Sequence, residues 1–227
     1  MKMPLHMLPW RQPQAMALAA QLACALAQAA PPLPAVQQAA LERAVADYQA
    51  GRHAAARVAL QALARQQVPA AQYNLAVMHL RAEVPRPSLQ QAARLLQAAA
   101  QGGFVTAQFM WAQALETGQF GPRDLARSHD WYERAAQAGS VPAQVAMGTA
   151  YYLGRGRGQD STLAAQWYRE AARGGDEGAM YLLASMYEQG DGLPRDRRLA
   201  RHWYGQAAAA GDVAARAKWQ ALPEAAD

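Results

Sequence analysis

Residues 154–179 read GRGRGQDSTLAAQWYREAARGGDEGA, and residues 190–215 read GDGLPRDRRLARHWYGQAAAAGDVAA. The second stretch starts 36 residues after the first. Both contain two loop glycines, an Asp, a Trp-Tyr pair, an Ala pair and a closing Gly at the same offsets. Self-similarity at a fixed period of about 20–50 residues is typical of proteins built from stacked structural repeats. The sequence therefore predicts a repeat architecture.

The same 36-residue register extends through most of the chain. In each unit an Ala occupies the first position, a Gly the last, and an Asp lies seven residues before the Trp of the pair. An earlier copy has Leu95 and Leu96 in place of the Trp-Tyr pair. The recurring positions are Ala71, Ala107, Ala143, Ala179 and Ala215; Gly103, Gly139, Gly175 and Gly211; Asp124, Asp160 and Asp196; and Trp131-Tyr132, Trp167-Tyr168 and Trp203-Tyr204.

Each unit predicts two helices joined by a loop. Residues 143–153 place apolar side chains on one helical face, so we expect a first helix there, called helix A. Gly154 is expected to end this helix in a left-handed conformation. The Asp160 carboxylate is expected to cap the second helix, helix B, and the Trp-Tyr pair to lie on its core face. Small residues recur where a neighbouring helix would approach closely: Ala76, Ala112, Gly148 and Ala184.

The composition favours an all-helical protein. Of the 227 residues 52% are hydrophobic, but much of that fraction is Ala and the chain has only 3 Phe. Ala favours helices, and the chain shows little of the alternating β-branched pattern of strands. Antiparallel helix pairs of this kind cannot bury their apolar faces alone. We therefore predict that they stack into an all-α, right-handed α-solenoid.

The first thirty residues have the layout of a secretory signal peptide. Lys2 and Arg11 precede an Ala-rich apolar run that ends in small residues and is too short to span a membrane. We expect export to the periplasm or the medium, with a cytoplasmic protein carrying an N-terminal extension as the alternative. Lipidation at Cys24 is disfavoured because the lipobox position three residues earlier is Gln21.

Charge and motif content argue against several classes of function. The formal net charge is +5, and without the first thirty residues 20 basic groups face 17 acidic ones. This balance is too even and too dispersed for a nucleic-acid groove. The single cysteine lies in the expected signal peptide, and the histidines show no metal-ligand spacing. We therefore expect no catalytic residue, no metal and no cofactor.

The repeated pattern resembles a known family. Residues 143–175 follow A-x3-[LM]-[GA]-x2-[YL]-x2-G-x-G-x3-D-x6-WY-x2-AA-x2-G, which is similar to the Sel1-like repeat (SLR) family, a branch of the tetratricopeptide superfamily. Residues 81–88 replace the glycine loop in one unit, and Phe120 stands at a loop glycine in another. The paired cysteines of one secreted SLR subgroup, and any β-lactam-related activity attached to it, are not expected here.

The resemblance and the register together predict the domain organisation. We expect a signal peptide over 1–30, a divergent tetratricopeptide-like helix pair over 31–69, four Sel1-like repeats over 70–211, and a capping helix with a tail over 212–227.

The resemblance implies a function in recognition. SLR proteins are often envelope, secretion or host-interaction scaffolds, and helix A lines the concave face in such solenoids. We predict a non-enzymatic scaffold or adaptor that binds another protein or peptide there, through side chains that vary between repeats at offsets +2, +6 and +9 from the first Ala. The candidate residues are Tyr73, Phe109, Gln113, Glu116, Thr149, Tyr152, Tyr181, Ser185 and Glu188.

Arginines around the loops between helices A and B support an alternative function. They predict a basic edge that could recognise an acidic protein, or an envelope polysaccharide such as peptidoglycan, although charge runs are usually solvated surface. A cytoplasmic regulatory adaptor is a further alternative. The arginines of this edge are Arg155, Arg157, Arg195, Arg197 and Arg198.

Overall fold

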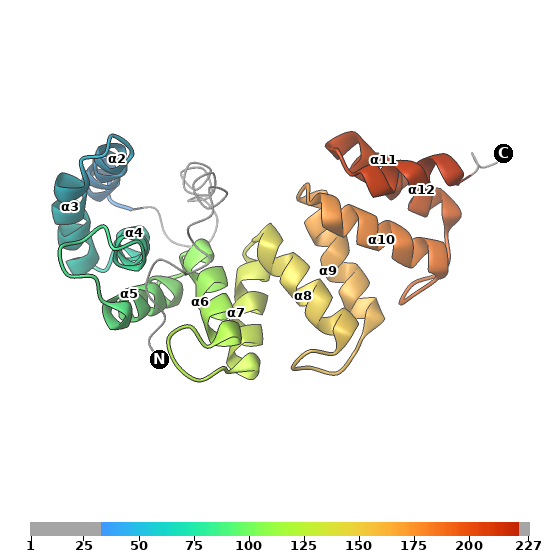
Figure 1. The fold of residues 1–227 in the computed structure, drawn as a ribbon, viewed down its shortest axis with the longest axis horizontal. Coiled ribbons are helices and arrows are strands. Elements are labelled where there is room, and N and C mark those ends of the chain that lie inside the picture. Colours follow the sequence, from blue (N-terminus) through green and yellow to red (C-terminus); the bar gives the residue numbers. More distant parts are fainter. Residues whose placement is uncertain (1–32, 223–227) are drawn as a thin grey trace. The chain divides into compact units, whose positions relative to one another are not determined.

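The computed structural model describes residues 33–222, and every regular element in that range is an α-helix (Figure 1). The predicted signal peptide therefore lies outside the described residues, as does Cys24. The helices are α2 (Ala35–Gln49), α3 (His53–Arg65), α4 (Pro69–Leu80), α5 (Leu89–Gln101), α6 (Val105–Thr117), α7 (Leu125–Gln137), α8 (Val141–Leu153), α9 (Ser161–Arg173), α10 (Glu177–Gln189), α11 (Arg197–Ala210) and α12 (Val213–Ala221).

The chain divides into two compact units. Unit 1 ends at Arg123 and contains α2 to α6, and unit 2 begins at Asp124 and contains α7 to α12. Within each unit, helices that follow one another in the sequence also pack against one another. The connections between consecutive helices of a unit are short, which favours antiparallel neighbours. The predicted all-α solenoid class, with a 36-residue period, is confirmed.

The predicted N-caps are present at the start of the B helices. The Asp160 carboxylate accepts a hydrogen bond from the Leu163 amide at 2.9 Å. The Asp124 and Asp196 carboxylates cap α7 and α11 in the same way. In the earlier unit the same column is Ser88, whose hydroxyl caps α5. Each cap satisfies an amide that has no partner within the helix, so the recurring column fixes where helix B begins.

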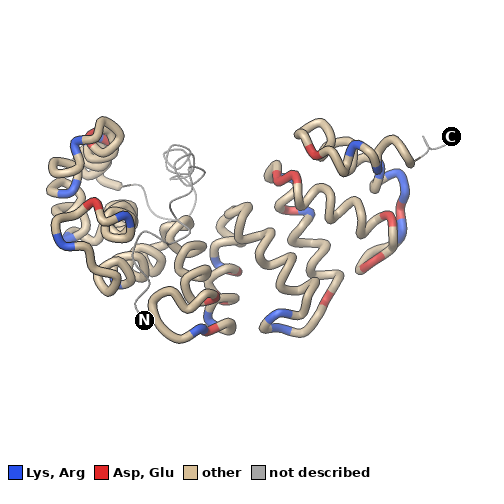
Figure 2. The backbone as a smooth tube through the Cα atoms, in the orientation of Figure 1, with Lys and Arg blue, Asp and Glu red and all other residues tan. Residues whose placement is uncertain are grey.

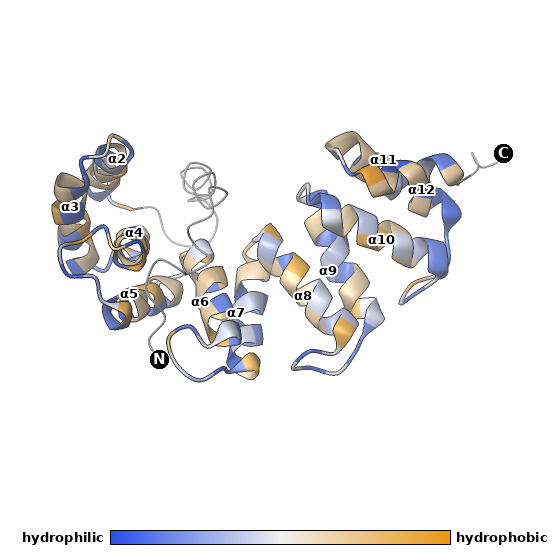
Figure 3. Cartoon of the chain, viewed as in Figure 1, coloured by the Kyte–Doolittle hydropathy of each residue, from blue (hydrophilic) through white to orange (hydrophobic). Residues whose placement is uncertain are grey.

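Glycines end the A helices α6, α8 and α10, as predicted for Gly154, whereas α4 is followed by Arg81 in the right-handed region. Gly154 follows α8 with φ 66°, and Gly118 and Gly190 follow α6 and α10 with φ 73° and 80°. These values lie in the left-handed region, which glycine enters without a Cβ clash. The loops that follow are hydrophilic, whereas the helices alternate polar and apolar positions (Figure 3).

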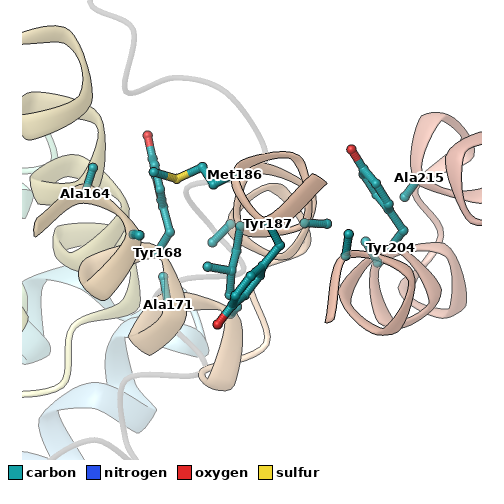
Figure 4. Packing of buried hydrophobic residues seen from close by; sticks show 14 of the residues in the cluster. Ala164, Tyr168, Ala171, Met186, Tyr187, Tyr204 and Ala215 are labelled. Carbon is teal, nitrogen blue, oxygen red and sulfur yellow. The ribbon is translucent and has the colours of Figure 1, made fainter. Parts of the chain in front are cut away.

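The core of unit 2 is made of alanines and tyrosines. Tyr168 and Tyr204 are 2% and 0% exposed, and they lie among fully buried alanines of α9, α10 and α11 (Figure 4). Gly148 shows how close the helices are, since a Cβ at that position would lie 2.7 Å from the Tyr168 ring. The small-residue column is thus required by packing, because Ala and Gly leave room for the large rings.

One expectation about this core is wrong. The sequence predicts that both members of the Trp-Tyr pair lie on the core face of helix B, but of these residues only Tyr132, Tyr168 and Tyr204 are buried. Trp131, Trp167 and Trp203 are partly exposed. Successive residues of a helix point about 100° apart, so both rings cannot face the centre of the same core. The Trp therefore lies at the margin of the core.

Unit 1 has a separate, more aliphatic core. Leu41 of α2, Leu60 of α3, and Leu75 and Met78 of α4 are all buried within it. The loop that replaces the glycine pattern also contributes, because Val84 is buried in the same cluster. Unit 1 thus obtains from aliphatic side chains the packing that tyrosines supply in unit 2.

Candidate interaction surface

The nine candidate residues lie on the A helices and are named here the helix-A face. Four of them lie in unit 1, on α4 and α6, and five lie in unit 2, on α8 and α10. Each side chain is partly exposed, which is the degree of burial expected beside a core but within reach of a partner. By unit, the residues are Tyr73, Phe109, Gln113 and Glu116, then Thr149, Tyr152, Tyr181, Ser185 and Glu188.

In unit 2 the helix-A face is joined to the core by tyrosine hydroxyls. The Tyr168 hydroxyl lies 3.1 Å from the Thr149 hydroxyl. The Tyr204 hydroxyl donates to Glu188 Oε2 at 2.9 Å, and the Tyr204 ring meets the Tyr181 ring edge-on at 5.3 Å between centroids. The hydroxyls of these buried tyrosines therefore hold Thr149 and Glu188 of the helix-A face in position from the core side.

The sequence pattern does not predict this second role of the tyrosines. The Trp-Tyr column recurs on helix B, and such recurrence indicates packing alone. The sequence does contain one indication of this role. Each of these two units has a polar residue at offset +6 of helix A, Thr149 or Ser185, within reach of a hydroxyl from helix B. Only the packing of α8 on α9 places such groups within hydrogen-bond distance.

Electrostatics keep the Glu188 carboxylate ionised. Burial raises the pKa of Glu188, but hydrogen bonds from Lys218 and Tyr204 lower it more, so the pKa lies below its ordinary value. The pKa of Tyr204 is raised by burial and by this carboxylate. Burial also raises the pKa of Tyr152, and the neighbouring Asp191 raises it further. In unit 2, a tyrosine with a raised pKa thus lies beside each of two acidic residues: Tyr204 beside Glu188 of the face, and Tyr152 of the face beside Asp191.

In unit 1, Tyr73 of the helix-A face is an aromatic residue that packs against a neighbouring ring. Its ring packs against Phe104 with 5.0 Å between centroids, and burial raises the pKa of Tyr73 to about 12. Nearby, the Tyr48 hydroxyl donates to Glu83 and accepts from Arg81, each at 2.8 Å. This network joins α2 to the residues at the end of α4.

The five arginines of the basic edge do not share one environment. Lys and Arg lie in the α8–α9 loop and at the start of α11 (Figure 2). Arg157 forms ion pairs with Asp130 at 3.1 Å and Glu133 at 3.4 Å, so its charge is compensated by α7. Arg195 Nε donates to the Glu188 carbonyl at 3.0 Å and closes the α10–α11 loop.

The contact made by Arg195 is a property of the repeat. Gln159 occupies the same column and donates to the Tyr152 carbonyl at 3.0 Å, and Arg123 donates to the Glu116 carbonyl at 2.7 Å. The remaining arginines of the edge, Arg155, Arg197 and Arg198, are exposed. Arg195 is exposed as well, and its bond to a neutral carbonyl leaves its charge uncompensated. An anionic partner would therefore depend mainly on these four arginines.

Over residues 33–222, no group of three or more His, Cys, Asp or Glu side chains is arranged to hold a metal ion. In the same range, no helix combines the length and the apolar character that a membrane crossing requires.

Comparison with known proteins gives one family and several solved structures. The Sel1 repeat family matches residues 69–104, 105–140, 141–176 and 178–212. No curated protein matches the chain.

Two of the solved structures are similar over most of this chain. One is c5321, described as a protective antigen present in uropathogenic Escherichia coli strains and displaying an SLR fold. It is 28% identical with a TM-score of 0.75, over 81% of this chain and 40% of that one. The other is a Sel1 repeat protein from Oxalobacter formigenes, 35% identical with a TM-score of 0.70, over 74% of this chain and 49% of that one. The chain thus spans less than half the length of either relative.

Proposed function

This chain belongs to the Sel1 repeat family, and from that premise we propose that it is a non-enzymatic scaffold or adaptor that binds a segment of another protein on its helix-A face. Sel1 repeats mediate protein–protein interactions, and the family is typically non-enzymatic. A stacked helical array needs little ordering when it binds, so shallow contacts on several helices can add up to useful affinity.

The observation that carries the proposal is the construction of the helix-A face in unit 2. Tyr152 and Tyr181 are partly exposed aromatic side chains, and aromatic residues are frequent anchors of protein interfaces. Thr149 and Glu188 lie on the same helices and are held by buried tyrosine hydroxyls. Aromatic anchors beside prepositioned polar groups are what a peptide-binding surface requires.

We place this interaction in the cell envelope or outside the cell. The support is the composition of the first thirty residues, where two basic residues precede an apolar run. The alternative is an adaptor in the cytoplasm, which would use the same face for an intracellular partner.

The test is a capture experiment with the full chain immobilised and offered envelope extract. Tyr152→Ala and Tyr181→Ala are expected to reduce the amount of the specific partner about tenfold or more, the usual effect of truncating an interface anchor. Gln166→Ala, at an exposed position of α9, is the matched control and should bind normally. Circular dichroism should show equal helical content in all variants. Normal capture by both tyrosine variants would overturn the proposal.

A second candidate function uses the basic edge. Arg155, Arg195, Arg197 and Arg198 are exposed, and they could hold an anionic polysaccharide or an acidic protein. Binding to such a partner would fall with added salt and would vanish when Arg195, Arg197 and Arg198 are changed to Ala, while Tyr152→Ala would leave it intact.

A further inference from the structure

The C-terminal helix places a cation on the helix-A face. Lys218 Nζ of α12 forms an ion pair with Glu188 Oε2 of α10 at 3.0 Å. The same ammonium lies 6.0 Å from the centroid of the Tyr204 ring. Earlier helices of unit 2 have Ala146 and Leu182 in the column that Lys218 occupies, so this cation is particular to α12.

The surroundings of Glu188 form a binding site for an ammonium group. A carboxylate next to an aromatic ring attracts a cation both by charge and through the π-face of the ring. Tyr204 donates to Glu188 from the core, and Tyr181 packs on Tyr204, so both the carboxylate and the ring are fixed by contacts that do not involve Lys218. The site would therefore keep its geometry if Lys218 left. Arg197 also acts on Glu188 electrostatically and would stay in place, since it belongs to α11.

The helix that supplies Lys218 is weakly packed. Of its nine residues only Ala215 is buried, while Val213 is 76% and Trp219 38% exposed. Its other contacts are few: the Trp219 ring lies against Gly205 of α11, and Leu222 packs at the margin of the core. The Arg201 guanidinium lies 5.0 Å from the Trp219 ring, and Arg201 Nε donates to the Leu222 carbonyl. A helix with so little buried apolar surface opens at low cost in free energy.

We propose that α12 is an autoinhibitory cap, in which Lys218 occupies on Glu188 the position taken by a lysine side chain of the partner. Partner binding and docking of α12 then compete for one carboxylate. This inference rests on the proposed function, because it assigns the partner's chemistry at the same helix-A face: a segment with a lysine that is complementary in charge to Glu188.

The experiment uses the full chain and a fluorescein-labelled hexalysine peptide at low ionic strength, with binding followed by fluorescence polarisation. Lys218→Met is expected to raise the affinity about two- to fivefold, since an exposed ion pair of ordinary strength no longer competes. Lys218→Arg should bind like the wild type, and Glu188→Gln should bind more weakly. In the wild type, added hexalysine should speed amide hydrogen exchange in residues 213–221.

A matched control separates competition from net charge. Arg216→Met removes one positive charge from the same helix at an exposed position, so its effect measures the general attraction of the peptide to a less basic protein. If Lys218→Met and Arg216→Met raise the affinity equally, the autoinhibitory cap is wrong. If Glu188→Gln has no effect, the ammonium site itself is wrong. Neither result affects the capture experiment with Tyr152→Ala and Tyr181→Ala, so failure of this inference and failure of the proposed function are distinguishable.

Discussion

The buried tyrosine of helix B has two roles in this protein. Its ring fills a space that alanines and Gly148 leave open, and its hydroxyl reaches the helix-A face. Tyr168 meets Thr149 there, and Tyr204 meets Glu188. A phenol suits this position because its body is apolar and its far end can donate or accept a hydrogen bond. The neighbouring Trp cannot replace it, since it points away from the centre of the core.

We predict that the two members of the pair differ in their contribution to stability. Tyr168→Ala should lower the free energy of unfolding by about 3–5 kcal/mol, the usual cost of emptying a buried aromatic site. Trp167→Ala should cost clearly less, because the indole is partly exposed. Urea unfolding followed by circular dichroism measures both.

Tyr168→Phe is the control for the hydroxyl. It keeps the ring and removes the contact with Thr149, so a loss of about 1 kcal/mol is expected. Equal losses for Tyr168→Ala and Trp167→Ala would contradict the assignment of the core to the tyrosine.

At the scale of the element, many of the residues that recur in each repeat lie at the ends of the helices. An Asp or Ser begins each of α5, α7, α9 and α11, and a left-handed Gly follows each of α6, α8 and α10. These groups satisfy backbone amides and turn the chain, so they act through local geometry. Between these ends the helices are free to vary at the offsets that form the helix-A face.

Removing a cap should destabilise its helix by a predictable amount. Asp160→Ala leaves the first amides of α9 without the carboxylate, and a loss of about 0.5–2 kcal/mol is expected. Asp160→Ser should retain most of the stability, because Ser88 caps α5 with the same geometry. Thermal unfolding compares the two variants. A serine variant as unstable as the alanine variant would show that Asp160 contributes something other than a cap.

At the scale of the whole molecule, the chain corresponds to a part of each solved relative described above. It spans less than half the length of either one. What the chain shares with them is the repeat, and the repeat supplies an array of A helices on which partner contacts can be placed.

We predict that the whole protein is exported from the cytoplasm. The intact mass of the protein recovered from separated cell fractions should show loss of about thirty N-terminal residues, with recovery from the periplasm or the medium. A full-length protein in the cytosol would overturn export, leave the repeat fold unaffected and direct the search for partners inside the cell.

Residue identities and their spacing are enough to predict the repeat, its period and the ends of the helices that carry the Asp and Gly columns. Asp160 and Gly154 act on backbone within a few residues, and identical columns recur every 36 residues, so these features could be predicted from letters and spacing alone. The sequence also nominated the helix-A face by offset, and whether a partner binds there stays a prediction.

Contacts between side chains of different helices follow from the packing of the folded chain and not from the spacing of the repeat. Thr149 and Tyr168 are 19 residues apart, and Lys218 and Glu188 are 30 apart. Their contact depends on how one helix is rotated against the next, and a periodic pattern gives that rotation only to within the width of a helical face. Trp167 and Tyr168 are neighbours in the sequence, so their side chains point about 100° apart around the helix axis, and the core has room for one of the two rings. The periodic pattern does not distinguish which of the two is buried.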